Sequence, residues 1–543
     1  MSRRRSNSKH GSMPARRPKP VGAPASAHDD PDLTVTNSRA LVEQFMAYID
    51  LIHDELIEPI QQRLDDHPGA VSGVRWKHII LGHLISVASG DRPVITKVRA
   101  HLWAMDDDLA DLIGLGWPSY RQLISQYHRG IELVKELFPL DTALNTPAAN
   151  GGEPKRGFLE AYIVRLLART RTAGYEPTIV QAIDGTYVKS WGRSAETDPD
   201  AAWAHAPGNW SEENYFGYEA HLMVDTRMQS ATSMGPRLIT SAVVVAGSAH
   251  RGQASLPMIA MAKRELGVAE VIVDRGYSQL GHLAWGETLA KLGVLQHIDL
   301  KTTQRAVGYY NGALIIDGWV FSPSLPERLR QLPNYARDMT FEEREALLDL
   351  YDERARYAFK FHGFDRKGNP RFVAPCLVGS VRCTQRRSSL SGELDTPYVH
   401  GPVGVSVTPR TTDVTHEASG ATTPVELPRS CTGATFSVPL EQFDGTFQKY
   451  PFGTRRWMQQ YGQRSQVESI NAALQQGECR IAERDLVRVR TGYARAFGIA
   501  MAAIVHNLKV IRHWNEYYAA HGTTRAAEAA KEEARRRKRA ITE

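Results

Sequence analysis

The sequence predicts an α/β protein with three parts: an all-helical N-terminal region, a central sheet, and a mainly β insertion within the central part. Between residues 36 and 145, apolar residues recur at three- and four-residue steps, which is the period of helices with one buried face. Two short β-branched apolar runs end at Asp184 and at Asp274, as is typical of buried strands. Residues 301–450 carry short strand-like runs separated by turn residues, and they form the predicted insertion.

The basic charge of the chain gathers at its two ends. The 543 residues have a formal net charge of +6. Residues 1–35 are expected to form a disordered basic arm, because the first twenty hold Arg and Lys but no acid. Residues 519–543 form a predicted charged tail that ends in the basic run 535–539. Both segments suit association with a phosphate backbone without sequence preference, and a solvated tail with no specific partner is the alternative.

Residues 36–145 are predicted to form a helical DNA-binding domain. Residues 41–60 have the pattern of one amphipathic helix, and residues 78–88 that of a shorter, nearly all-apolar helix. Ser119 is the predicted N-cap of a later helix. That helix is expected to expose Tyr120, Arg121, Gln122, Gln126 and Arg129. Short helices followed by one bearing Arg and Gln fit a helix-turn-helix reader of DNA, with Arg121 as a contact, and a plain helical bundle with a polar face is the alternative.

Two strands of the central region are predicted to end in an acid. Residues 179–183 are apolar and mostly β-branched and lead into Asp184, and residues 269–273 lead into Asp274. Asp184 is followed by glycine, so a tight hairpin turn is the alternative there. Asp274 has the alternative of starting a turn or capping a helix.

The residues between these acids predict how the two strands are arranged. Residues 217–225 and 237–246 have the pattern of further strands, and residues 255–266 that of an amphipathic helix. The order strand, strand, strand, helix, strand places Asp184 and Asp274 on neighbouring strands. Asp225 also ends a predicted strand and is a rival carboxylate.

A third acid, Glu468, lies on a predicted helix near the C-terminus. Because residues three or four apart lie on the same face of a helix, this helix carries one polar stripe, formed by Tyr461, Arg464, Glu468, Asn471 and Gln475. A solvated face with an Arg–Glu pair is the alternative for this stripe. Three converging carboxylates, however, can hold two divalent cations for phosphodiester chemistry.

The chain after Glu468 continues a long helical pattern, from residue 486 to residue 511, that is expected to cover one face of the sheet. Four arginines on this segment are candidates to face DNA: Arg484, Arg488, Arg490 and Arg495.

Taken in order, these motifs resemble those of the DDE transposases of bacterial insertion sequences. The matching residues are Ile183–Thr186, Val273–Tyr277, Tyr461, Arg464 and Glu468. In that family a Lys follows the Glu after six intervening residues, whereas this chain has Gln475 there. An amide can hydrogen-bond DNA but cannot neutralise a phosphate, so this departure bears on strand-end binding more than on metal binding.

The resemblance implies a ribonuclease-H-like catalytic core formed by residues 157–300 and 451–518. The chain between Asp274 and Glu468 is far too long for one connection, and the insertion 301–450 is expected to fill it. The linker before the core is predicted at residues 144–156.

The resemblance also implies the chemistry of the site. Asp184, Asp274 and Glu468 are expected to be catalytic and to hold two Mg²⁺ ions, for which Mn²⁺ can substitute. Tyr461, Arg464 and Gln475 are expected to contact DNA. Water would cut the transposon end, and the freed 3′-hydroxyl would then attack target DNA.

The expected partners are double-stranded DNA, as terminal inverted repeats and as target, and a second copy of the chain in a homodimeric synaptic complex. A nuclease on the same fold that cuts without joining is one alternative, and a non-catalytic DNA-binding descendant of a transposase is another. No Walker loop, GxSxG elbow or HExxH helix is present in the sequence, which removes the simplest rival enzymes.

Composition favours a cytoplasmic protein, and the resemblance implies that it associates with the nucleoid. Four cysteines in this length argue against a disulfide scaffold. The chain has no run of eighteen apolar residues, so no membrane span is expected, and its start lacks the apolar region of a secretion signal.

The insertion carries several further predictions. Asn311-Gly312 predicts a hairpin turn, residues 341–359 a charged helix, and residues 386–430 a long exposed loop. Trp319 is predicted to be a core residue, and stacking on an unpaired base is the alternative. A zinc site is a weaker hypothesis for a set of residues without a CxxC pair: Cys376, Cys383, Cys431 and His400.

Overall fold

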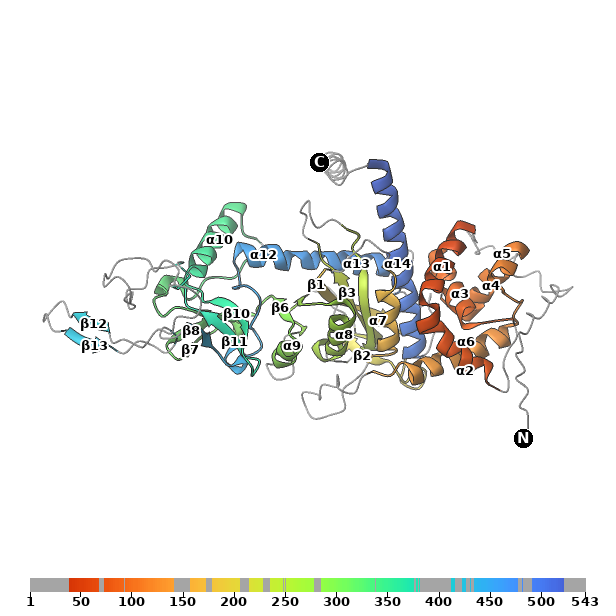
Figure 1. The fold of residues 1–543 in the computed structure, drawn as a ribbon, viewed down its shortest axis with the longest axis horizontal. Helices are drawn as coiled ribbons and strands as arrows, with labels where there is room; N and C mark the ends of the chain where they lie inside the picture. Colours follow the sequence, from red (N-terminus) through yellow and green to blue (C-terminus); the bar gives the residue numbers. More distant parts are fainter. Residues whose placement is uncertain are drawn as a thin grey trace, which may run out of the picture.

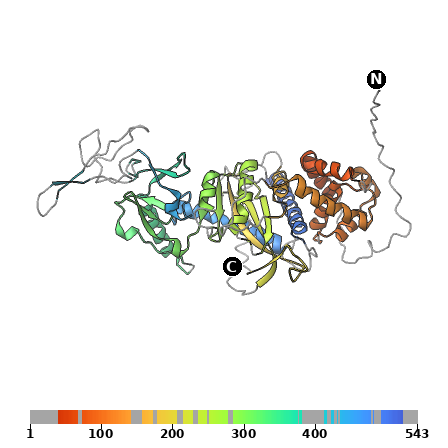
Figure 2. The same cartoon turned by 90° about the horizontal axis from the view of Figure 1, so that it is seen from below.

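The protein is an elongated α/β molecule with three parts arranged along its long axis (Figures 1 and 2). In this computed structural model the helical N-terminal part and the insertion lie at opposite ends, and the main sheet lies between them. The residues that the structure describes are 39–67, 73–91, 93–140, 157–171, 178–205, 214–227, 235–247, 249, 251–277, 285–336, 338–375, 377–378, 380, 412–415, 422–425, 430, 434–476, 481 and 491–521.

The N-terminal part is all helical, as predicted. Its helices are α1 (Arg39–Ile52), α2 (Glu58–Asp65), α3 (Trp76–Ala88), α4 (Ile95–Trp103), α5 (Asp107–Ile113) and α6 (Tyr120–Leu137). A π-helical turn over His53–Ile57 interrupts the predicted long first helix. The predicted cap is confirmed, because the Ser119 hydroxyl accepts a hydrogen bond from the backbone N–H of Gln122.

These helices share one hydrophobic core with the central part. Trp76 of α3 lies against Phe497 of α14 (Gly492–His521), with ring centroids 5.6 Å apart. The Tyr48 hydroxyl donates to the carbonyl of Leu166 in α7 (Glu160–Ala168) at 2.8 Å. Apolar residues of α1, α3, α7 and α14 therefore pack against each other without an intervening polar layer.

The helix α14 lies at the centre of this packing. Over Gly492–Tyr517 it is long and apolar enough to cross a membrane by length and composition alone, a property that the sequence prediction did not expect. Its most apolar stretch is 83% buried inside the protein, and a core helix passes the same test.

The main sheet has six strands in the order β2-β3-β1-β5-β6, with β4 also paired to β3. Their bounds are β1 (Val180–Lys189), β2 (Ala202–His205), β3 (Asn214–Asp225), β4 (Ile239–Ala246), β5 (Glu270–Val273) and β6 (Leu295–Ile298). The pairs β1–β3, β2–β3 and β3–β4 are antiparallel, whereas β1–β5 and β5–β6 are parallel. The predicted neighbouring position of the two acid-bearing strands is confirmed.

The two faces of the sheet pack against different helices. Alternate residues of a strand point to opposite faces, so Ala182 and Val188 belong to a core with α7, α13 (Ser465–Gln476) and α14. Ile183, between them, belongs to a second core that includes Leu256 and Met258 of α8 (Arg251–Leu266). The first of these faces is the one that carries Asp184, two residues from Ala182.

The insertion is built from small sheets and one long helix. After α9 (Glu287–Lys291), it contains β7 (Val307–Tyr310), β8 (Ala313–Ile316), β9 (Trp319–Phe321), α10 (Phe341–Ala355), β10 (Lys360–Phe364), β11 (Pro370–Val373), β12 (Thr412–Thr415), β13 (Thr422–Val425) and β14 (Phe436–Ser437). The hairpin turn is confirmed, because Asn311 and Gly312 both have positive φ. The loop prediction for 386–430 is wrong at one place, where β12 and β13 pair.

Two further predictions on the insertion have different outcomes. Trp319 is a core residue, as predicted, because it is 4% exposed and its ring stacks on that of Phe447. The zinc hypothesis falls outside the described residues, which include none of its three cysteines nor His400.

Candidate active site

Asp184 lies in the middle of β1, where the strand continues past it. The alternative of an Asp-Gly hairpin turn is wrong, because Asp184 and Gly185 pair with Leu222 and His221 of β3. The side chain of Asp184 is 17% exposed. Its Oδ2 accepts a hydrogen bond from Nδ2 of Asn471 at 3.0 Å, and its Oδ1 lies 3.6 Å from Nη1 of Arg464.

Burial raises the pKa of Asp184 to about 6. The positive charge of Arg464 lowers this pKa, and the negative charges of Asp274 and Glu468 raise it. The three predicted acids therefore lie close enough to influence each other electrostatically.

Asp274 follows the last residue of β5 and lies level with Asp184. The parallel pairing of Ala182 with Ile272 places each acid two residues beyond a paired position. One Asp274 oxygen, Oδ1, accepts a hydrogen bond from the backbone N–H of Gly276 at 2.7 Å. The other, Oδ2, lies 3.8 Å from Nη1 of Arg251.

Glu468 approaches from α13, a helix that packs on β1. Its side chain is 47% exposed and forms an ion pair with Arg464, which also contacts Asp184. We call Asp184, Asp274, Glu468 and Arg464 the acid cluster.

The polar stripe of α13 faces β1 rather than open solvent at two further positions. Asn471 reaches Asp184, and the Gln475 amide donates to the hydroxyl of Thr186. Tyr461 ends α12 (Arg455–Tyr461), and a 3-10 turn over Gly462–Arg464 separates it from α13. Its ring stacks on that of Trp457, with centroids 4.9 Å apart, and it packs against the edges of both hydrophobic cores.

The acid cluster does not form a ready metal site. Within the described part of the chain, no group of three His, Cys, Asp or Glu residues is placed to hold an ion. The Arg464 guanidinium instead lies between Asp184 and Glu468. The donors themselves fit Mg²⁺, because carboxylates are the hard oxygen ligands that it prefers, and Arg464 supplies positive charge where an ion would.

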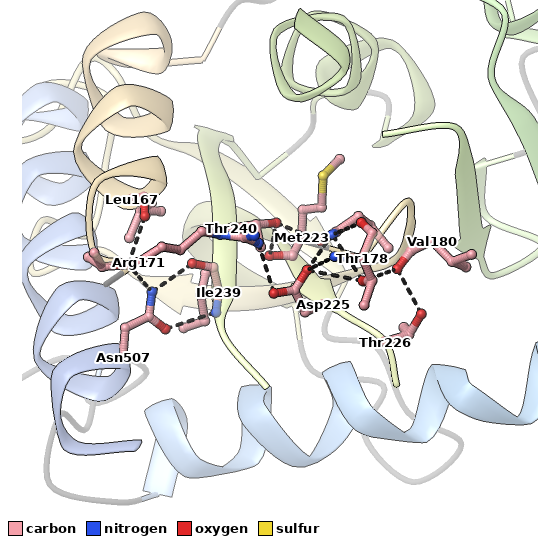
Figure 3. Close-up of polar contacts among 12 residues, drawn as sticks. Leu167, Arg171, Thr178, Val180, Met223, Asp225, Thr226, Ile239, Thr240 and Asn507 are labelled. Carbon is pink, nitrogen blue, oxygen red and sulfur yellow. Dashed lines mark hydrogen bonds and ion pairs between the residues drawn. The ribbon is translucent and has the colours of Figure 1, made fainter. Parts of the chain in front are cut away.

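Asp225, the rival carboxylate, has a different environment. It is fully buried and forms an ion pair with Arg171 at 2.8 Å (Figure 3). The Thr178 hydroxyl and the Gln181 amide donate to its Oδ1 at 3.1 and 2.5 Å. We call these four residues the Asp225 network.

The network continues into the helices that flank the sheet. The Thr240 hydroxyl donates to Gln181, and Asn507 of α14 bonds both backbone groups of Ile239 (Figure 3). Asp225 therefore holds the ends of β1 and β3 together through these contacts, and its buried carboxylate is not accessible to a ligand.

Sequence reasoning missed two charged residues beside the acid cluster. Glu219 of β3 is 4% exposed and forms an ion pair with Arg251, the first residue of α8. Burial raises the pKa of Glu219 to about 7; Arg251 lowers it, and the charges of Asp184 and Asp274 raise it. An acid inside an otherwise apolar predicted strand was the available signal.

Other predicted DNA contacts lie away from the acid cluster. Arg121 is exposed at the start of α6, in the helical N-terminal part. Gln126 is 3% exposed, so its predicted exposure is wrong, because it lies on the same buried face of α6 as Leu123 and Gly130. Arg495 is 2% exposed and donates to the carbonyl of Lys189, so it does not face DNA.

The remaining predictions about DNA contacts and flexible segments fall outside the described residues. They concern Arg484, Arg488, Arg490, the basic arm 1–35, the linker 144–156 and nearly all of the tail 519–543.

Comparisons with family models, with curated proteins and with solved structures find no match to this chain. The resemblance to DDE transposases stays a prediction that rests on the motifs and on the geometry of the acid cluster.

Proposed function

We propose that this protein is a DDE transposase that cuts transposon ends and joins them to target DNA by a two-metal phosphodiester transfer. The observation that carries the proposal is the gathering of three acids that are far apart in sequence. Asp184 and Asp274 lie level on adjacent parallel strands, and Glu468 is linked to Asp184 through Arg464.

The order of elements supports a ribonuclease-H-like core. Such a sheet requires the order strand, strand, strand, helix, strand, and the chain has β1, β3, β4, α8 and β5, with the short β2 as an addition. The helix that carries Glu468 packs on the sheet face that carries Asp184, which is the arrangement that a shared site needs.

Asp184, Asp274 and Glu468 would hold two Mg²⁺ ions, or Mn²⁺ in their place. These ions would activate the attacking oxygen and stabilise the leaving one. Asn471 fixes the orientation of Asp184 from α13. Arg464 would exchange its contact with Asp184 for a DNA phosphate and keep its contact with Glu468, because a guanidinium binds both groups well.

The proposed partners are the transposon ends and target DNA, with a second copy of the chain in the synaptic complex, in the cytoplasm at the nucleoid. Tyr461, Arg464 and Gln475 would contact the DNA strand at the acid cluster. Arg121 would contact DNA separately, because it is exposed on α6 in another part of the molecule.

A cleavage assay tests this function. The substrate is duplex DNA that carries the short inverted repeats flanking the coding sequence, with Mg²⁺ or with EDTA. We expect the wild-type chain to nick it only with Mg²⁺, and Asp184→Asn to bind the same DNA without nicking it. Asp50→Asn, on an exposed residue of α1, is the matched control and is expected to nick normally. Full nicking by Asp184→Asn would refute the assignment.

One observation favours a second function, that of a non-catalytic DNA-binding descendant. Gln475 replaces the usual Lys and is bonded to Thr186, and Arg464 lies between two of the acids. Failure of the wild-type chain to nick with either Mg²⁺ or Mn²⁺, with end binding intact, would favour this function over the transposase.

A further inference from the structure

A polar pair lies behind the acid cluster, on the opposite face of β1. Glu219 and His221 project from β3 over Gly185, the residue that follows Asp184. A Cβ on Gly185 would lie 2.6 Å from Oε1 of Glu219 and 3.0 Å from Nδ1 of His221. A side chain at this position would therefore displace the Glu219 carboxylate and crowd the His221 ring.

Arg251 connects this pair to the acid cluster. Its Nε lies 2.8 Å from Oε1 of Glu219, and its Nη1 lies 3.8 Å from Oδ2 of Asp274. Oδ1 of Asp274 is held by the backbone of Gly276, whereas Oδ2 faces Arg251 at a distance longer than a hydrogen bond, so Arg251 does not satisfy this oxygen. One guanidinium therefore spans a buried carboxylate and a candidate metal ligand.

The segment after Asp274 is held by the same strand. Tyr277 is fully buried, and its hydroxyl lies 2.8 Å from Nδ1 of His221. Glu219 and His221, two residues apart on β3, thus reach the carboxylate of Asp274 through Arg251 and the chain that follows it through Tyr277. This arrangement has the form of the supporting groups that orient metal ligands in other proteins.

We propose that Arg251, anchored by Glu219, is a positioning residue that orients the carboxylate of Asp274 for a divalent cation. The inference rests on the proposed function, because it assigns a metal-binding role to Asp274. A buried Glu219 without Arg251 would repel Asp274, and Arg251 without Glu219 would lose its anchor, so the two residues act as one unit.

The test measures Mn²⁺ binding to the full chain by calorimetry, without DNA. We expect Arg251→Gln and Glu219→Gln each to weaken Mn²⁺ binding about tenfold, the lower end of the effect of supporting residues on metal affinity. The double variant should bind as weakly as either single variant. Arg251→Lys should also bind weakly, because a compact ammonium cannot span both carboxylates.

Thermal unfolding and DNA-end binding of each variant separate positioning from general damage. The expected result is weaker Mn²⁺ binding by variants that still fold and still bind DNA ends, with a lower unfolding temperature for Arg251→Gln because Glu219 loses its counter-charge. Arg251→Lys keeps that charge and serves if a Gln variant unfolds. Full recovery by Lys, additive losses in the double variant, or a loss in Glu219→Gln alone would overturn the inference. Absence of Mn²⁺ binding by the wild-type chain would instead overturn the proposed function.

Discussion

Two aspartates on adjacent strands of one sheet have opposite environments. Asp184 and Asp225 lie on β1 and β3, and Asp225 pairs with Gln181, three residues before Asp184. The Asp225 network gives its carboxylate one buried cation and several hydrogen-bond donors. In the acid cluster, Asp184 has one cation and two further acids nearby.

The difference shows that residue type and strand position do not decide the role of a buried acid. A carboxylate whose oxygens are all satisfied by the protein stabilises the fold, and it has no capacity left for a ligand. A carboxylate beside other carboxylates costs stability unless a cation joins them. The surplus of negative charge around Asp184 is thus the physical basis of the cation-binding role that we propose for it.

Replacing each aspartate by asparagine gives the largest expected contrast. Asp225→Asn should lower the free energy of unfolding by about 3–5 kcal/mol, because it leaves the buried Arg171 without its counter-charge. Asp184→Asn should raise it by about 1–2 kcal/mol at pH 7, because it removes an acid whose pKa is raised to about 6. Urea denaturation in EDTA measures the free energy of unfolding of both variants. Equal decreases in the two variants would contradict the expected contrast.

Removing the Arg464 guanidinium from the acid cluster tests the same comparison in a second way. Arg464→Gln should tighten Mn²⁺ binding about tenfold, or about 1.4 kcal/mol, because without DNA the guanidinium no longer competes with the ion for Asp184. Calorimetry measures the affinity. Arg455→Gln, which breaks ion pairs between α12 and α10 outside the acid cluster, is the control and should leave the affinity unchanged. Weaker binding by Arg464→Gln would contradict this account.

The hydrogen-bonded residues His297 and Glu270, on the adjacent strands β6 and β5, predict a smaller effect that depends on pH. Burial lowers the pKa of His297, although its hydrogen bond to Glu270 opposes this. Burial raises the pKa of Glu270, but His297 and Lys449 more than offset it, so that pKa lies below its ordinary value. Because both pKa values are lower in the folded protein than in the unfolded chain, the protein is more stable at neutral pH than in acid.

Acid should therefore remove this stability in two steps. As pH falls below about 6.5, the unfolded chain protonates His297 more readily than the folded protein does, so the free energy of unfolding decreases. The same happens for Glu270 as pH falls below about 4.3. We expect wild-type stability to fall by about 1 kcal/mol more than that of His297→Gln between pH 7 and pH 5. Denaturant unfolding at both values measures this, and identical slopes would contradict it.

The sequence pattern predicts the strands of the central sheet well because they are buried on both faces. Residues 179–183 and 269–273 are short and mostly apolar, with Gln181 and Glu270 as the exceptions, and their pairing follows from the order of elements. The acids that end or interrupt these runs stand out for the same reason. The acid cluster was therefore accessible from the sequence, as was the Arg464–Glu468 pair, which follows from the four-residue spacing. The contact of Arg464 with Asp184 was not accessible, because it depends on how two distant segments meet.

Failures of prediction occur where packing covers a polar side chain. Gln126 lies within the buried face of α6, and Arg495 is covered at the end of β1, where it donates to Lys189. The period of the apolar residues does not report either environment. Glu219 and Arg251 are adjacent only because β3 and the start of α8 meet beside β1. No local pattern reports such a meeting of distant segments.

A strand-transfer reaction tests the shared role of the acid cluster most directly. Pre-nicked inverted-repeat ends are incubated with a supercoiled target plasmid and Mg²⁺, and covalently joined products are counted on a gel. The wild-type chain is predicted to give joined products, and Asp184→Asn, Asp274→Asn and Glu468→Gln none. Cutting without joining by the wild-type chain would indicate a nuclease, and joining by any of the three variants at the wild-type level would contradict a single centre built from these acids.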